Sequence, residues 1–329
     1  MTFVADTGGT DPLEPALSCR PFATLAILAV ASLAAPAQAS PLTVLDILQQ
    51  FNAVIVDEFH SGHDVEGRLV AGNIKSGAQF YENPRGTSAD SAFAGVNALT
   101  ISNTFANVDH GASVNVQNSV SNSRLNFNGG GQLVQQSPAF KMSDFTIPLD
   151  ALQDTLKALD ANSKFDASDA NRFTFKLTPD ADGLAVFSVS AETLAKARNI
   201  LFSGSATSII VNVRGEEWNG TSTNFNVSGD LNRELIWNFA DATRLNFSGW
   251  HGTVLAGNAS VQNSSAMEGT LYAQDFNGNG ELHDFGFDGR LPGSSQRNAL
   301  LSLNVPEPAS LALVMVGLAA AGLSRRRRT

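Results

Sequence analysis

The sequence is poor in the residues that cross-link chains and build many active sites. Its 329 residues include a single cysteine, Cys19, and five histidines. No Ser-His-Asp or Cys-His set stands in a recognisable nucleophile motif, and no glycine-rich phosphate loop is present. A single thiol cannot close an internal disulfide, but the chain is long enough to bury a core without one. Its length is compatible with one domain.

Positive charge is also scarce. Lysine and arginine number 21 against 31 aspartates and glutamates, which gives a net charge of −10 at pH 7. A surface of this sign repels phosphate backbones and anionic lipid headgroups. The composition therefore argues against a protein that binds nucleic acid.

The N-terminal region contains an export signal. An apolar run at 22–35 is followed by Ala37 and Ala39, the small-x-small pattern that precedes signal cleavage. We expect the Sec machinery to read residues 1–39 as a signal helix and the mature chain to begin at Ser40. Because Arg20 is the only cation before this run, we expect the true start to lie downstream of Met1.

The C-terminal region combines an apolar segment with a basic cluster. Residues 309–323 carry no charge, and as a short helix they could cross a locally thinned bilayer. The arginines that follow would stop transfer on the cytoplasmic side, and Pro306 and Pro308 keep the preceding segment extended. These residues fit either a simple anchor or a protease site beside the membrane. The arginines are Arg325, Arg326, Arg327 and Arg328.

Val305-Pro306-Glu307-Pro308, followed by the apolar segment and the arginines, resembles a PEP-CTERM sorting signal over residues 305–329. The resemblance implies a Gram-negative cell and recognition at the Pro-Glu-Pro site by exosortase, a membrane transpeptidase-like enzyme. It also implies transient anchoring in the inner membrane, followed by transfer to the cell surface or the extracellular matrix.

The body of the chain alternates apolar and polar residues in short stretches, such as "SVNVQNSVSNSRLNFNGGG" and "TSIIVNVRG". This period of two predicts half-buried strands, and the asparagines and glycines between them suit tight turns. A sandwich, a barrel and a β-solenoid all remain compatible with the pattern. No clean repeat period is evident, which weakens a regular solenoid.

One segment has a helical period instead. Its apolar residues recur every three or four positions, which predicts an amphipathic helix near 146–162 that packs on the β body. Thr146 is the expected N-cap, and Pro148 suits the first turn. The apolar face consists of Phe145, Leu149, Leu152, Leu156 and Leu159.

Several short motifs follow one another in the body of the chain: Asp64-Val65-Glu66-Gly67-Arg68, Ala71-Gly72-Asn73, Asn212-Val213-x-Gly215, Trp237-Asn238-Phe239-x-x-Ala242 and Gly252-Thr253-Val254-Leu255-Ala256. Through these motifs the region from Phe51 to Pro292 resembles the choice-of-anchor A domain, whose members carry exchangeable C-terminal anchors. The resemblance implies an adhesin-like, irregular right-handed β-solenoid with one long packed helix, similar in outline to ice-binding proteins. It gives a domain at 40–292, a spacer at 293–304 and the sorting segment at 305–329. Gly257 departs from the family, which usually has proline there.

Two motifs could bind metal ions. His60, His63 and Asp64 include a His-x-x-His pair, although further ligands are not evident, and a turn is the simpler interpretation. Asp275, Asn277 and Asn279 match the first half of a calcium loop, with Glu281 or Asp284 as further ligands. Gly286 occupies the position of the acidic twelfth ligand, so a tight hairpin is the alternative to a weak calcium site.

The remaining candidates concern sugars. Asp64 and Glu66 could serve a glycosidase only if they faced each other across a cleft, and a surface pair beside Arg68 is the simpler expectation. Trp218, expected in an exposed loop, and Trp250, at a turn, could stack on sugar rings, whereas Trp237 is expected in the core.

Together these features predict a non-enzymatic, exported surface or matrix adhesin that needs no cofactor and binds polysaccharide or another cell-surface ligand. An ice- or crystal-binding protein is an alternative, although no Thr-x-Thr array is present. A carbohydrate-active enzyme is another, and it would need converging carboxylates.

Overall fold

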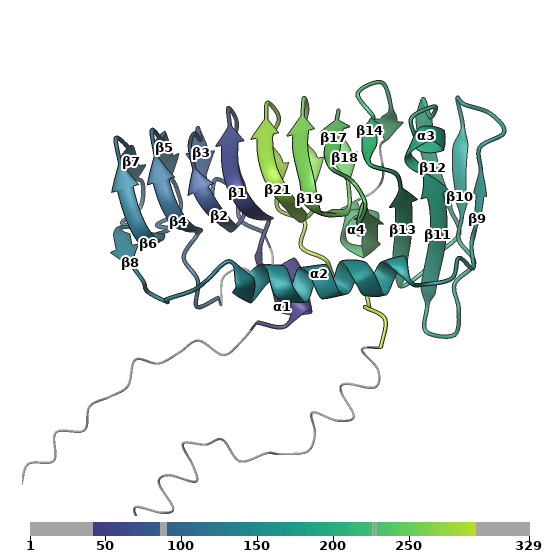
Figure 1. The fold of residues 1–329 in the computed structure, drawn as a ribbon, viewed down its shortest axis with the longest axis horizontal. Coiled ribbons are helices and arrows are strands. Elements are labelled where there is room, and N and C mark those ends of the chain that lie inside the picture. Colours follow the sequence, from purple (N-terminus) through teal and green to yellow (C-terminus); the bar gives the residue numbers. More distant parts are fainter. Residues whose placement is uncertain (1–41, 86–90, 226, 228, 294–329) are drawn as a thin grey trace, which may run out of the picture. The chain divides into compact units, whose positions relative to one another are not determined.

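The computed structural model describes residues 42–85, 91–225, 227 and 229–293, which form a mainly β structure with helices against one face of its largest sheet (Figure 1). The predicted signal helix, the predicted membrane helix and the sorting residues lie outside these ranges. Within them, no helix is both long and apolar enough to cross a membrane. The helices of this part are α1 (Val44–Gln50), α2 (Ser143–Lys157), α3 (Ala191–Leu194) and α4 (Gly229–Glu234).

The largest sheet, called the main sheet here, consists of parallel strands stacked side by side. Two short strands, β14 (Glu217–Asn219) and β17 (Arg244–Phe247), join it beside β19. The order of the other strands is β11 (Leu184–Ser190), β13 (Ser208–Arg214), β16 (Leu235–Asn238), β19 (Thr253–Asn263), β21 (Leu271–Gly278), β1 (Ala53–Ser61), β2 (Leu69–Ile74), β4 (Val96–Ser102), β6 (Val114–Ser121) and β8 (Leu133–Gln135).

This order shows that the first strand of the described chain, β1, lies in the middle of the main sheet. Strands β1, β2, β4, β6 and β8 lead to one end, α2 then crosses the sheet, and β11, β13, β16, β19 and β21 return to the middle (Figure 1). The first and last of these strands, β1 and β21, therefore pair in parallel, with Val54 opposite Tyr272. Residues more than 200 positions apart in the sequence become neighbours.

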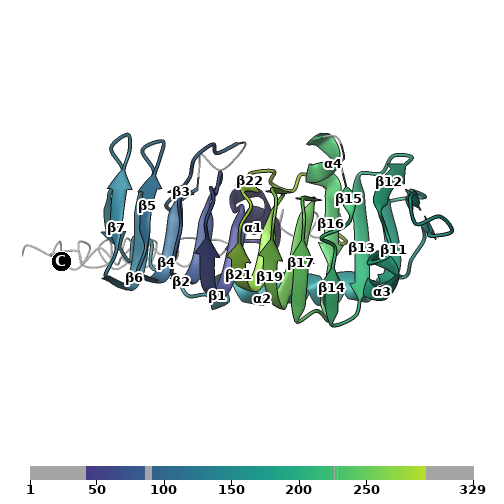
Figure 2. The ribbon, with the colours of Figure 1, turned by 90° about the horizontal axis from the view of Figure 1, so that it is seen from above.

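Shorter strands form the other faces, and they can be followed in Figure 2. Val65 bridges to both Phe80 and Leu282, which joins two of these sheets into one surface. Parallel pairing between successive coils is consistent with a β-helix, and among the described strand pairs only β9–β10 is antiparallel. The sheets are β15 (Asn224–Phe225), β12 (Asn199–Ser203), β10 (Phe173–Lys176) and β9 (Lys164–Asp166); β18 (Trp250–His251), β20 (Met267–Glu268) and β22 (Leu282–His283); and β3 (Gln79–Phe80), β5 (Phe105–Val108) and β7 (Arg124–Phe127).

Apolar side chains form two cores on opposite faces of the main sheet. The inner core lies between the sheets and includes Ile55, Phe59 and Trp237, all fully buried. The outer core lies under the helices, where Val54 and Leu255 of the sheet pack with residues of α1 and α2. Strands covered on both faces bury consecutive residues, as the fully buried run at the start of β1 shows.

Helix α2 confirms the predicted apolar face but not the predicted ends. Phe145, Leu149, Leu152 and Leu156 are buried against the sheet, as the periodicity indicated. The helix begins at Ser143, so the prediction of Thr146 as N-cap is wrong, and Pro148 lies inside the helix rather than in its first turn. The earlier start has a local cause, because Asp144 accepts a hydrogen bond from the Lys141 amide at 2.8 Å and holds the entering chain.

A local repeat is present that the sequence analysis missed. Asn122 donates to Asn103, Asn126 to Asn107 and Asn128 to Asp109, and each pair is separated by 19 residues. The coil at 102–120 is therefore 19 residues long, and the coil at 121–137 lies on it in one constant register. Neighbouring coils differ in length, which hides this period in the sequence as a whole.

Candidate functional site

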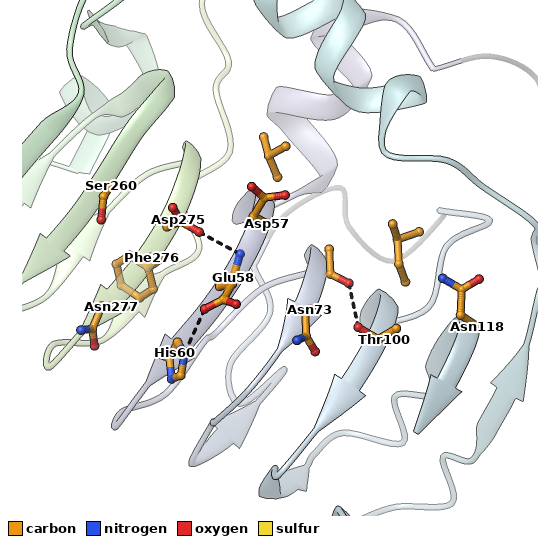
Figure 3. A pocket seen from close by; sticks show the side chains of 13 residues that line it. Asp57, Glu58, His60, Asn73, Thr100, Asn118, Ser260, Asp275, Phe276 and Asn277 are labelled. Carbon is orange, nitrogen blue, oxygen red and sulfur yellow. Dashed lines mark hydrogen bonds and ion pairs between the residues drawn. The ribbon is translucent and has the colours of Figure 1, made fainter. Parts of the chain in front are cut away.

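A groove crosses the outer face of the main sheet where α2 no longer covers it. It has a volume of about 700 Å³ and draws residues from β19, β21, β1, β2, β4 and β6 (Figure 3). We call it the sheet groove. Its lining consists of Val56, Asp57, Glu58, His60, Gly72, Asn73, Leu99, Thr100, Asn118, Ser260, Asp275, Phe276 and Asn277.

The groove follows a line of irregularities in strand pairing. The register shifts between Ile55 and Glu58 where β1 meets β2, between Ala98 and Thr100 where β4 meets β6, and between Ala256 and Ser260 where β19 meets β21. Such bulges bend a strand and redirect its side chains. Before the bulges the outward residues are apolar and lie under α2, whereas beyond them the outward residues are polar.

Two glycines permit the close approaches at this line. A Cβ at Gly72 would lie 2.8 Å from the Asp57 carbonyl oxygen and closer still to that of Val56. A Cβ at Gly257 would lie 2.5 Å from the Tyr272 ring. Each glycine follows an alanine and precedes an asparagine, in Ala71-Gly72-Asn73 and Ala256-Gly257-Asn258. This repeated tripeptide was the sequence signal that could have located the groove.

A row of polar residues, one from each of eight neighbouring strands of the main sheet, runs along the groove and past one end of it. Strand register and one hydrogen bond, from the Glu58 amide to Asp275 Oδ1 at 3.1 Å, connect its members. The row runs perpendicular to the strands, so its members recur about every 4.8 Å. We call it the polar row; it consists of Glu217, Arg244, Ser260, Asp275, Glu58, Asn73, Thr100 and Ser119.

The carboxylate of Glu58 is the most strongly engaged charge in the groove. It pairs with Lys75 Nζ, and His60 Nε2 lies 3.8 Å from its second oxygen. The hydrogen bond from Lys75 lowers the pKa of Glu58 below its ordinary value, so the side chain is ionised at neutral pH. At Glu58 the groove thus presents a fixed negative charge, beside the amides and hydroxyls of its other lining residues.

The residues chosen as calcium ligands are only partly brought together by the groove. Asp275 and Asn277 both line it, whereas Asn279 is not among its lining residues. The hairpin alternative is wrong: β21 ends at Gly278 and β22 follows in a different sheet, and both strands pair in parallel with their neighbours. The segment between Gly278 and Leu282 instead leads from the main sheet to the sheet that contains β22. The calcium set stays a prediction.

The residues of the His-x-x-His motif lie in different places, because β1 ends at Ser61, between the two histidines. His60 lines the groove, but His63 and Asp64 do not. Burial and the nearby carboxylate of Glu281 raise the pKa of Asp64. Among the described residues, no three histidine, cysteine, aspartate or glutamate side chains are arranged to hold a metal ion.

The expectation that Asp64 and Glu66 form a surface pair beside Arg68 is wrong, because Glu66 and Arg68 are both buried. Glu66 pairs with Arg85 at 3.0 Å and accepts a hydrogen bond from the Asp284 amide at 3.0 Å. Arg68 donates to backbone carbonyls, including Ala94 O at 2.9 Å. Glu66 and Arg68 thus hold the segments around Arg85 and Ala94 against the domain. Burial raises the pKa of Asp284 to about 6 within this network.

The predicted sugar-stacking role conflicts with the positions of both tryptophans. Trp218 is 2% exposed and Trp250 is fully buried, so the exposed loop expected for Trp218 is wrong. Their rings lie 4.8 Å apart, and Trp250 lies at the same distance from Trp237, which is in the core as expected. A ring enclosed by other aromatic rings offers no face to a sugar. The glycines around these residues indicated turns, but the turns fold the indoles inward.

A second polar cluster lies on the face formed by β18, β20 and β22. His251, Glu268 and His283 occupy one register position on three adjacent strands. His283 Nδ1 lies 3.8 Å from Glu268 and its Nε2 lies 2.8 Å from Glu281. These carboxylates, Glu268 first, raise the pKa of His283 to about 9, although burial acts in the opposite direction. The histidines strongly lower the pKa of Glu268.

Comparison with known families agrees with this architecture. A family model for an ice-binding-like adhesive domain matches residues 44–284, nearly all of the described coils. The chain belongs to this family of adhesive domains.

A second match covers the C-terminal end, where a PEP-CTERM protein-sorting motif matches residues 304–328. The motif implies export, transient membrane sorting and exosortase processing, as the sequence predicted. No curated protein and no solved structure matches the chain.

Proposed function

We propose that this is a surface or extracellular-matrix adhesin that binds exopolysaccharide in the sheet groove and contributes to biofilm cohesion. In the finer classification it is a choice-of-anchor A protein with a right-handed β-solenoid fold. The polar row is the observation that carries this proposal. The adhesive family and the sorting motif support the location, and the groove supports the ligand class.

The polar row suits an extended polymer better than a small molecule. Its hydroxyl, amide and carboxylate groups recur at the spacing of the strands, which is close to the length of one sugar residue in an extended chain. Asn73 and Thr100 are adjacent members on one side of Glu58, and Ser260 and Asp275 lie on its other side. Hydroxyl groups of a polysaccharide can donate to the carboxylates and amides and accept from the amides and Thr100.

We further propose that the groove is not catalytic. Glycoside hydrolysis needs one carboxyl group that remains protonated near neutral pH, together with a second, ionised one. The hydrogen bond from Lys75 lowers the pKa of Glu58, which is the wrong direction for a general acid. The carboxylates therefore serve as hydrogen-bond acceptors.

Binding of exopolysaccharide from the native cells to the purified protein, measured by calorimetry, tests the ligand. The double variant Asn73→Ala/Thr100→Ala removes two adjacent members of the polar row and should weaken binding by about tenfold, the loss expected for one or two hydrogen bonds. Thr155→Ala, an equivalent change on the exposed face of α2, is the matched control. Equal affinity of the double variant and the control would reject the groove as the binding site.

The location is tested by the intact mass of the protein in membrane and medium fractions, with and without the processing enzyme. A secreted form that ends near Val305–Pro308 and depends on the enzyme supports the matrix location. A membrane form that keeps Arg325–Arg328 would make the tail a permanent anchor and contradict it.

A further inference from the structure

The coil at 121–137, called the terminal coil here, ends the stack of described strands, and no described strand lies on its outer side. Its two strands, β7 and β8, pair only with β5 and β6 respectively. Figure 1 places β7 and β8 at one end of the sheets, and Figure 2 shows β7 at the same end. Alternate backbone groups of each strand therefore point away from the sheet without a strand partner in the described part of the chain.

The interior of the domain is open at this coil. Leu133 is in register with Val114, which is fully buried, yet Leu133 is 44% exposed. Leu125 and Phe127 are in register with the buried residues of β5 and are themselves only partly buried. Side chains that continue the buried core by one more coil are thus partly exposed to solvent here. The end of a stacked core normally requires a cap.

The opposite end of the main sheet has such a cap. Asn162 lies along the free edge of β11, where its amide and side chain bond to Val186 and its side chain donates to Leu184 O at 2.9 Å. The neighbouring sheet ends in the antiparallel strand β9, which carries Lys164 and Asp166. No hydrogen bond of this kind reaches the outer edges of β7 or β8 within the described residues.

The terminal coil also carries a one-sided hydrogen-bond pattern. Asn122, Asn126 and Asn128 each donate an amide N–H back to the preceding coil, at 2.7, 3.2 and 2.6 Å respectively. Their Oδ1 atoms accept no hydrogen bond from the described chain, so acceptors remain for a further strand.

Charge favours a second copy of the chain as the partner. The whole protein has a net charge of −10, which opposes self-association through most of its surface. The terminal coil contains one charged residue, Arg124, and none of the edge lysines that usually prevent strands from pairing. The last described residue is 293. Close to it, the Arg290 amide donates to the Ser208 hydroxyl in β13, which lies far along the sheet from β8.

We propose that two copies pair end to end through their terminal coils, β7 against β7 and β8 against β8, around a twofold axis. Antiparallel pairing at such an axis satisfies both edges and joins the two exposed cores. Because a twofold contact uses the same surface on both copies, the assembly closes as a dimer instead of growing into a filament. The dimer would place two sheet grooves on one particle, although the pairing does not depend on what the grooves bind.

Sedimentation of the full chain in density-matched detergent tests the proposal. We expect the wild type to sediment with twice the mass of one chain, and Leu133→Lys to raise the dimer dissociation constant by at least about tenfold. Leu201→Lys changes an equally exposed leucine, 41% accessible, at the other end and should leave the dimer intact. A wild type that stays monomeric, or a folded Leu133→Lys variant that still dimerises, overturns the proposal.

Spin labels give an independent measurement of the geometry. In a Cys19→Ser background, labels at Arg124→Cys should show a short distance between copies, whereas labels at Leu201→Cys should be far apart. Dimers in which only the Leu201→Cys labels approach each other would place the contact at the opposite end and overturn the proposal.

Discussion

Asn238 in β16 and Gln153 in α2 exchange hydrogen bonds across the outer core. The Asn238 side chain donates to Gln153 O at 3.0 Å, and the Gln153 side chain donates to Asn238 Oδ1 at 3.3 Å. Asn238 also donates to Asn212, which in turn donates to Leu156 O at 2.7 Å. Both partners are nearly fully buried, so this network fixes the position of α2 on the sheet in a way that apolar contacts alone would not.

Asn238→Ala should therefore destabilise the domain by about 2–3 kcal/mol, because it leaves buried amide and carbonyl groups without partners. Urea denaturation measures this change in the free energy of unfolding. Asn219→Ala, at an exposed position in β14, is the control and should change stability by less than about 0.5 kcal/mol. Equal effects of the two substitutions would show that the network does not anchor the helix.

Gly72→Ala should destabilise the domain by about 2 kcal/mol or more, because the new methyl group meets two backbone carbonyls that cannot move independently. Gly62→Ala is a matched control, since the nearest atom to its Cβ would be 3.8 Å away. Thermal unfolding of the two variants measures the difference. A Gly72→Ala protein as stable as the control would mean that β1 and β2 can separate freely at the bulge.

Stability should depend on pH through His283. Its pKa in the folded protein, about 9, lies above the ordinary value of 6.5, so the protonated ring is favoured in the folded state. The contribution is complete below pH 6.5 and is lost as the pH rises through about 9, with an order of magnitude of about 2 kcal/mol. Urea denaturation between pH 6 and 10 measures it.

The control for this prediction is His283→Gln, which cannot be protonated. Its stability should fall less over the same pH range than that of the wild type. His60→Gln, at a more exposed ion pair with Glu58, should keep the wild-type slope. A slope that His283→Gln leaves unchanged would assign the titration to another group.

The tryptophans should behave as core residues. Their fluorescence should resist quenching by acrylamide in the folded protein and should not change when polysaccharide is added, since all three rings are buried. Trp250→Ala should cost about 3–5 kcal/mol of stability, the usual loss for a large buried ring. Quenching of the native protein as strong as that of the unfolded chain would contradict the burial of the rings.

Local patterns predicted local structure well. The spacing of Phe145, Leu149, Leu152 and Leu156 identified the buried face of α2, because a helix repeats every 3.6 residues wherever it packs. The helix start was missed, since the bond between Asp144 and the Lys141 amide depends on how the chain arrives. Trp218 was misplaced for a related reason: its neighbours indicate a turn, but not the direction in which the turn points the ring.

The sheet groove could be predicted only in fragments. Asp275, Asn277 and His60 were singled out for other reasons, and the repeated Ala-Gly-Asn tripeptide was visible without a meaning. Glu58 and Thr100 were not identified, and Asn73 appeared only as part of a family motif, because polar residues in alternating strands look alike until their neighbours are known.

The sequence by itself determined the acidic surface, the short strands separated by asparagine and glycine, the apolar face of one helix and the sorting motif, since each depends on residues close together in the chain. Only the tertiary structure decided that β1 lies beside β21 and that the bulges of six strands form one line. The tertiary structure also decided that β7 and β8 are edge strands and that core positions such as Leu133 are exposed beside them. The physical reason is that coils of unequal length stack by matching their interiors, and α2 carries the chain from one end of the sheet to the other before the order is complete.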